Sequence, residues 1–147
     1  MQFFKRKKNV SNNASENIDG VSLLEKHKNG LISDESFLVS FSRVKVFFST
    51  PFGDHEDGGS RLFALPDQDE TAYLPAFTSA ERLMEFYEKA GRCGFMIIED
   101  TFMSFLETTK KINAGNTPVK LGAVIDPGYY GVTVGANMLD VVIGMVK

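Results

Sequence analysis

Three carboxylates follow apolar runs of the sequence and are the residues best placed to do chemistry. Glu99 and Asp100 come directly after Ile98, and Asp126 follows a second apolar run. The carboxyl ends of parallel strands are where α/β proteins usually bind ligands. Carboxylates gathered there can act as acid and base or hold magnesium. The alternative is structural, with Asp100 capping a helix and Asp126 organising an Asp-Pro-Gly turn. Because no partner of defined spacing accompanies them, the structural use is favoured.

A second acidic group lies in a turn-rich segment. It offers oxygen and imidazole donors to a divalent cation, from Asp54, His55, Glu56 and Asp57. An EF-hand loop needs alternating ligands before one glycine and a closing glutamate, whereas two adjacent glycines, residues 58 and 59, interrupt that series. A solvated hairpin turn is therefore favoured, and the sequence predicts no metal site.

The single cysteine is the only thiol that could serve as a nucleophile. Cys93 has Arg92 beside it, which would favour a thiolate. A nucleophile also needs a positioned base, and spacing gives that role to neither His27 nor His55. The serine-hydrolase pattern G-x-S-x-G and the common phosphate-binding glycine patterns are absent. We therefore predict no catalytic residue and no cofactor.

Thr78 and Ser79 stand where a strand-like run turns into a helix-like one, a place that can bind an anion or simply begin a helix. Thr78 and Glu81 have the T-x-x-E spacing of a capping box, in which the hydroxyl accepts from the amide of residue 81 and the carboxylate reaches back. Glu81 also adds negative charge where an anion would lie. The spacing predicts a structural helix cap formed by Thr78 and Glu81.

Other residues are candidates for contact with a partner protein. Tyr129 and Tyr130 form an aromatic pair beside a turn, and tyrosine supplies large contact area at low entropic cost. The alternative is that one ring only covers the sheet edge. Pro75 lacks an amide proton, which predicts an edge strand or a bulge. Met138 and Met145 lie outside the main apolar stripe of the last predicted helix and suit a second contact.

Alternating helix-like and strand-like runs must position these residues. Helical spacing marks residues 19–28, 33–43, 79–91, 100–115 and 136–147, and strand-like runs cover 43–52, 60–66, 71–77, 94–99, 118–128 and 131–134. Asp19, Ser33 or Asp34, and Asp100 or Thr101 are available as caps. We predict an α/β (α+β) fold with a mixed sheet of about five to six strands, an antiparallel meander first, covered by helices.

Length and charge limit the possible classes of protein. With 147 residues, 43% of them hydrophobic, we predict a flexible basic and polar tail over residues 1–18 and one domain over residues 19–147. The net charge is −3 although four cations, residues 5–8, lie together, so the body is acidic and we expect no nucleic-acid partner. No apolar run can span a bilayer and no signal peptide is evident, which predicts a cytoplasmic protein. The basic tail could make a weak surface contact with anionic lipid, but a solvated tail is favoured.

Three segments share a recognisable pattern: ESFLVSFSRVKVFFSTP (35–51), YLPAFTSAERLMEFY (73–87) and LGAVIDPG (121–128). In order and spacing they resemble the N-terminal domain of the SseB family, the enhanced serine sensitivity proteins. The Phe-Thr-Ser-x-x-Arg-Leu corner from Phe77 to Leu83 is the most specific part. The resemblance implies an α/β domain over residues 23–146 and brings no catalytic residues with it. Family members often carry asparagine at the position of Asp126.

Together these observations predict a non-catalytic cytoplasmic domain that binds another protein, associates with itself or has a regulatory role. One alternative is a regulatory domain that binds a small ligand or an anion. A less well supported alternative is a metal-dependent enzyme that uses the acidic rim of Glu99, Asp100 and Asp126.

Overall fold

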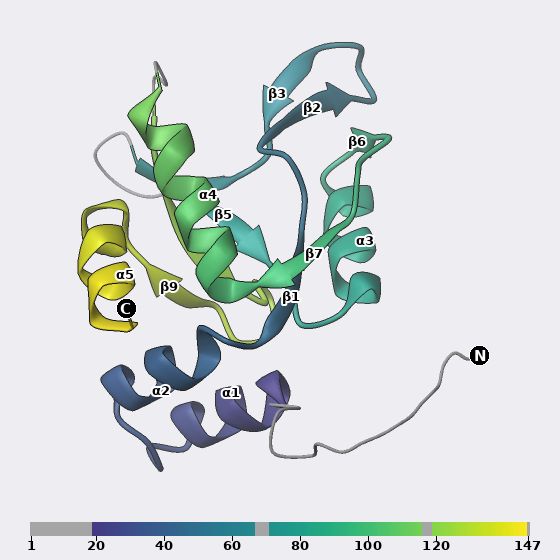
Figure 1. Cartoon of the computed structure of the whole chain (residues 1–147). Coiled ribbons are helices and arrows are strands. Elements are labelled where there is room, and N and C mark those ends of the chain that lie inside the picture. The colour runs from purple at the N-terminus through teal and green to yellow at the C-terminus, as the bar shows by residue number, and fades with distance from the viewer. Residues whose placement is uncertain (1–18, 67–70, 116–118, 147) are drawn as a thin grey trace.

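The computed structural model describes residues 19–66, 71–115 and 119–146 (Figure 1). The predicted tail, residues 1–18, lies outside the described residues. The helices are α1 (Gly20–Lys28), α2 (Asp34–Phe41), α3 (Ala80–Lys89), α4 (Phe102–Ala114) and α5 (Leu139–Val146), the last preceded by a short 3-10 turn, η2 (Ala136–Met138).

Most of the helices begin at residues that the sequence predicts as caps. Asp19, Ser33 and Thr101 each accept a hydrogen bond from a backbone amide two or three residues further along, at 3.0 to 3.2 Å. Each side chain satisfies an amide that has no partner inside its helix. The signals for α1, α2 and α4 are local, and these predictions are confirmed.

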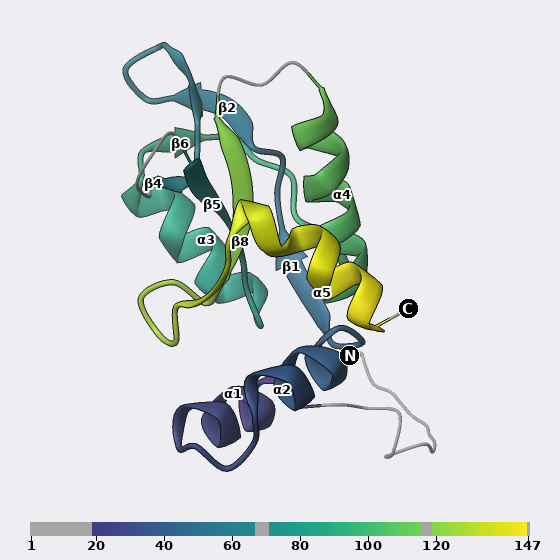
Figure 2. The ribbon, with the colours of Figure 1, turned by 90° about the vertical axis from the view of Figure 1, so that its left-hand side faces the viewer.

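A four-stranded sheet lies at the centre of the molecule. Its order is β4 (Leu65–Pro66), β5 (Thr71–Ala76), β8 (Lys120–Ile125) and β9 (Val132–Val134), with β5 and β8 parallel and the other two pairs antiparallel. Helices α3 and α4 lie on opposite sides of this sheet (Figure 2). A Cβ at Gly122 would lie 2.3 Å from the carbonyl oxygen of Val134 and 2.9 Å from the amide nitrogen of Ala136, so the chain that leaves β9 can pass this close to β8 only because β8 has glycine there.

The remaining strands form a long two-stranded ribbon with a hairpin at its far end. Strand β1 (Lys45–Phe48) pairs with β7 (Ile98–Thr101), and β2 (Phe52–His55) pairs with β6 (Arg92–Cys93) and with β3 (Ser60–Leu62). Phe48 lies opposite Ile98 and Asp54 opposite Cys93, so residues 49–53 face the shorter segment 94–97. The two pairings therefore belong to separate sheets, although the segments that carry them run side by side (Figure 1).

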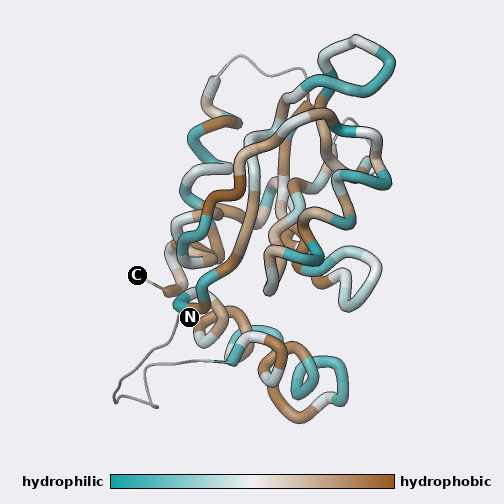
Figure 3. The backbone as a smooth tube through the Cα atoms, turned by 90° about the vertical axis from the view of Figure 1, so that its right-hand side faces the viewer, coloured by the Kyte–Doolittle hydropathy of each residue, from teal (hydrophilic) through white to brown (hydrophobic). Residues whose placement is uncertain are grey.

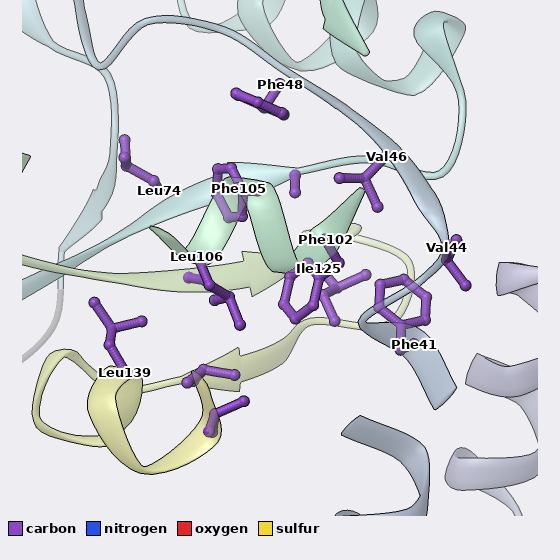
Figure 4. Close-up of a cluster of buried hydrophobic side chains, with 14 of the residues drawn as sticks. Phe41, Val44, Val46, Phe48, Leu74, Phe102, Phe105, Leu106, Ile125 and Leu139 are labelled. Atoms are coloured by element: carbon purple, nitrogen blue, oxygen red, sulfur yellow. The ribbon is translucent and has the colours of Figure 1, made fainter. Parts of the chain in front are cut away.

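Two clusters of buried side chains join these layers. The larger one packs Phe41, Phe102 and Phe105 against the sheet at Ile125, all at most 2% exposed (Figure 4). The smaller one lies under α3 and consists of Phe63, Phe77, Leu83 and Tyr87. In Figure 3 the interior strands are mainly hydrophobic, whereas the hairpin at the top is mainly hydrophilic. The core therefore lies on both faces of the central sheet.

The mixed α and β class is confirmed, but the strands pair differently from the prediction. They form sheets of two, three and four strands in place of one sheet. Two consecutive antiparallel pairings of the predicted meander form, β2 with β3 and β4 with β5, but most of the first strand-like run pairs with residues 98–101. Periodicity identifies a run as a strand, but the choice of partner depends on packing between segments that are distant in sequence.

The prediction that Pro75 marks an edge strand is also wrong, because β5 lies between β4 and β8 and Pro75 is buried. The carbonyl of Ala76 accepts from the amide of Asp126 at 2.8 Å, so the backbone groups of Ala76 point toward β8. Those of Pro75 point the other way. On that side β4 pairs as far as Tyr73, and β1 forms a bridge at Phe77. The amide proton that Pro75 lacks therefore falls between the pairing with β4 at Tyr73 and the bridge with β1 at Phe77.

Candidate functional site

The corner before α3 is capped by Ser79, so the predicted capping box of Thr78 and Glu81 is wrong. Ser79 Oγ accepts from the amide of Arg82 at 3.2 Å. The Thr78 hydroxyl donates instead to Oδ2 of Asp126 at 2.6 Å. Because Thr78 is engaged with the far end of β8, the helix begins one residue later than the spacing predicts, and Glu81 lies within its first turn.

Asp126 is the centre of this corner and is completely buried. Its Oδ1 accepts from the amide of Thr78 at 2.8 Å, and its Oδ2 accepts from Arg82 Nη1 at 2.7 Å as well as from the Thr78 hydroxyl. A buried carboxylate is tolerated when its lone pairs are satisfied and a cation lies beside it. The carboxylate of the protein itself therefore lies at the place where an external anion would contact the corner.

The backbone of Asp126 starts the turn that carries the two tyrosines. Its φ of 48° lies in the left-handed region, which asparagine and aspartate enter more readily than most residues. Its carbonyl accepts from the amides of Tyr129 at 3.0 Å and Tyr130 at 2.9 Å. The predicted role of Asp126 in the Asp-Pro-Gly turn is thus performed by its backbone, while its side chain joins the turn to α3.

Tyr129 is exposed yet held by two residues of α3. The guanidinium carbon of Arg82 lies 4.0 Å from the ring centroid, and the hydroxyl donates to Oε1 of Glu85 at 2.9 Å. The hydrogen bond to Glu85 raises the pKa of Tyr129 above its ordinary value, and the negative charge of Glu85 adds to the effect. The ring is 51% exposed. It therefore presents a large aromatic surface in a defined orientation.

Tyr130 points the other way and joins the turn to α1. Its hydroxyl donates to Oε2 of Glu25, and this hydrogen bond raises the pKa of Tyr130 above its ordinary value, with burial adding to the shift. The ring is half-buried and packs against the larger core cluster. The two neighbouring tyrosines thus bond to different helices, which fixes the turn between α1 and α3.

A pocket of about 490 Å³ lies between the α1–α2 pair and segment 129–133. Its floor is apolar, with Leu24 and Phe37 at most 1% exposed. His27 lies on its wall with Nε2 2.7 Å from Oδ1 of Asp34 and its ring centroid 4.6 Å from that of Phe37. A concave apolar site with a few polar groups has the ordinary composition of a binding pocket.

The three carboxylates of the predicted acidic rim do not come together. Asp126 follows β8, whereas Glu99 and Asp100 belong to β7 in the ribbon. Asp100 accepts from the amide of Thr101 at 2.7 Å and from the hydroxyl of Ser104 at 2.9 Å, and these bonds lower its pKa. Glu99 is exposed. Within the described ranges, no group of three or more His, Cys, Asp or Glu side chains is suited to hold a metal ion.

The other sequence candidates lie elsewhere on the surface. Met138 is 43% exposed, whereas Met145 is half-buried and packs against the core. The acidic turn is held by its own contacts, since Asp57 accepts from the amide of Gly59 at 3.0 Å and pairs with Arg61. These residues and the turn that carries Tyr129 and Tyr130 do not form a single site.

Sequence reasoning missed the residues that hold the two tyrosines in place. Glu25 belongs to a helix that reads only as polar, and Glu85 looks like an ordinary exposed helix residue. Arg82 carried a signal, because it is the cation of the Phe-Thr-Ser-x-x-Arg-Leu corner and lies one turn after Thr78. That signal indicates the need for a buried anion nearby, but the spacing along the chain does not identify Asp126 as that anion.

One of the comparisons with known proteins identifies the family of this chain. A family model described as SseB protein N-terminal domain matches residues 22–140, which include the Thr78, Arg82 and Asp126 network. The chain belongs to this family, as the resemblance of its segments implied. No curated protein and no solved structure matches. Among the described residues, no helix is long and apolar enough to cross a membrane.

Proposed function

We propose that this chain is a non-catalytic protein-binding domain and that the face around the Tyr129–Tyr130 turn contacts its partner. The observation that carries the proposal is the exposed ring of Tyr129, which Arg82 covers on one side and Glu85 holds at its hydroxyl. An aromatic side chain already fixed in place loses little conformational entropy on binding, and such residues commonly anchor protein interfaces.

The C-terminal helix α5 and the η2 turn before it supply a second contact in this proposal. Met138 and Val141 are 43% and 55% exposed, and both are apolar. Met145 is half-buried and offers less surface to a partner. Exposed apolar side chains of this size suit association with another protein or with a second copy of the chain.

The contacts of the carboxylates support a role without catalysis. The oxygens of Asp126 and Asp100 accept hydrogen bonds from backbone amides and hydroxyls that begin helices and turns. Lone pairs engaged in this way are less available to a metal ion than free ones. We place the domain in the cytoplasm, where an exposed lone thiol such as Cys93 stays reduced, and expect no nucleic-acid partner because the net charge is −3.

A second candidate function is the binding of a small regulatory ligand, and the pocket of about 490 Å³ favours it. A thermal-shift screen with metabolites tests this function directly. A ligand present at 100 times its Kd would raise the free energy of unfolding by about 2.7 kcal/mol.

Affinity capture from a lysate of the source cells tests the leading proposal. Wild type, Tyr129→Ala and Phe52→Ala serve as baits, because Phe52 is an aromatic residue of similar exposure, 48%, on the ribbon. We expect a protein that binds wild type and Phe52→Ala but not Tyr129→Ala. A partner that binds all three baits equally would contradict the assignment of this face.

A further inference from the structure

A free sheet edge borders the pocket. Strand β9 is the outer strand of the central sheet, and no strand of the described residues pairs on its other side. The carbonyl of Ile125 accepts from the amide of Gly131 at 3.0 Å, so Ile125 points its backbone groups toward β9. Val132 pairs with Ile125, and Val134 pairs with Ala123, so the backbone amides and carbonyls of both valines point back toward β8. The amide and carbonyl of Thr133, between them, therefore point away from the sheet.

Thr133 brings these outward groups to the pocket. Gly131, Val132 and Thr133 all line it, opposite Leu38 of α2 and above the buried Leu24. An edge strand beside an apolar pocket is the arrangement by which proteins bind extended peptides: the backbone pairs with the edge and a side chain enters the pocket. A small molecule could fill the pocket but would not pair with the strand in register.

The rim of the pocket indicates the charge of the segment that binds. Lys28 lies on the rim at the end of α1, next to Lys26 and His27. Asp34, the carboxylate on the opposite wall, is hydrogen-bonded to His27. Among the described residues, no ion pair includes Lys28. An acidic side chain of a bound segment would therefore find an available cation.

We propose that this pocket receives an extended segment of the partner protein, which pairs with the outer edge of β9, places an aliphatic side chain over Leu24 and Phe37, and directs an acidic side chain to Lys28. This inference rests on the proposed protein-binding function and specifies the part of the partner that is recognised. Tyr129 and Tyr130, which also line the pocket, form its remaining wall.

The test uses a phage-displayed library of short random peptides, selected on the full chain. We expect the selected peptides to share an aliphatic residue near an aspartate or glutamate. Thr133→Pro removes the outward amide, and proline is tolerated on an edge strand where its nitrogen faces solvent. Thr133→Val keeps that amide. Thr133→Pro should weaken peptide binding about tenfold, and Thr133→Val should leave it unchanged. Lys28→Glu should weaken the acidic peptides alone.

If Thr133→Pro does not fold, the peptide provides the same test, because methylating its pairing amide should weaken binding to wild type. Peptides that bind Thr133→Pro as tightly as wild type overturn the inference, and so does a selection that enriches no peptide.

A wild-type dimer that Thr133→Pro dissociates would make a second copy the occupant. A captured partner that depends on Tyr129 but tolerates Thr133→Pro leaves the proposed function standing, whereas one indifferent to Tyr129→Ala contradicts the function itself.

Discussion

At the scale of single residues, the buried carboxylate of Asp126 makes the largest contribution to the geometry of the candidate site. It connects the end of β8 to the start of α3 through Thr78 and Arg82, and its backbone begins the turn that presents Tyr129. An ion pair of this kind costs desolvation energy, so its main effect is to fix one arrangement of the turn rather than to add net stability.

Replacing Asp126 tests this assignment. Asp126→Ala leaves Arg82 without its partner and strains the left-handed backbone, so we expect a loss of about 3 kcal/mol in the free energy of unfolding. Asp126→Asn keeps an acceptor for the Thr78 amide and tolerates the positive φ, and its loss should be clearly smaller. Urea unfolding measures both. Equal losses for the two variants would show that the charge alone matters.

A second residue-scale prediction concerns Tyr87 in the smaller cluster. Burial raises the pKa of Tyr87 to about 12, and the nearby charge of Arg92 opposes the shift. The folded state therefore holds the phenolic proton more tightly than the unfolded chain, whose tyrosines titrate near the ordinary value of 10. The resulting stabilisation is fully present below pH 10 and is lost as the pH rises from about 10 to 12.

Tyr87→Phe should flatten this decline, although Tyr129 and the half-buried Tyr130, whose pKa values are also raised, contribute a smaller part of it. Denaturant unfolding at several pH values between 9 and 11 measures the slope. An identical slope in Tyr87→Phe and wild type would exclude Tyr87 as its source.

At the scale of elements, α1 is attached to the body by its buried Leu24 and by the hydrogen bond from Tyr130 to Glu25. Tyr130→Phe removes that bond and keeps the ring. We expect faster amide hydrogen exchange in α1 and unchanged exchange in α4, measured by mass spectrometry. Tyr129→Phe is the matched control, because it breaks only the bond to Glu85 on α3. Equal effects of the two variants on α1 would contradict the attachment.

The elements also mark the limit of what the sequence predicts. Caps such as Asp19 and Ser33 act within one turn, so the sequence identifies helix starts well. Strand pairing and the tyrosine contacts join residues that are far apart, as in the 105-residue separation of Glu25 and Tyr130. At Thr78 the two levels conflict: the local spacing favours a cap, but the tertiary bond to Asp126 takes its hydroxyl.

At the scale of the whole molecule, the family segments are also the structural frame of the candidate site. The corner from Phe77 to Leu83 and the turn after Ile125 meet through Asp126, and together they orient the exposed tyrosine. The sequence singled out Tyr129 and Tyr130 as a pair, but it did not predict that α1, α2 and β9 enclose a pocket beside them. That enclosure depends on the tertiary arrangement of three separate segments.

The most direct measurement of the central claim is the affinity of a captured partner for wild type, Tyr129→Ala and Phe52→Ala, determined by titration calorimetry. Truncating an anchor residue at an interface typically costs 2 kcal/mol or more, which is about a 30-fold rise in Kd. We predict a rise of about that size for Tyr129→Ala and an unchanged Kd for Phe52→Ala. An unchanged Kd for Tyr129→Ala would contradict the claim that this face binds the partner.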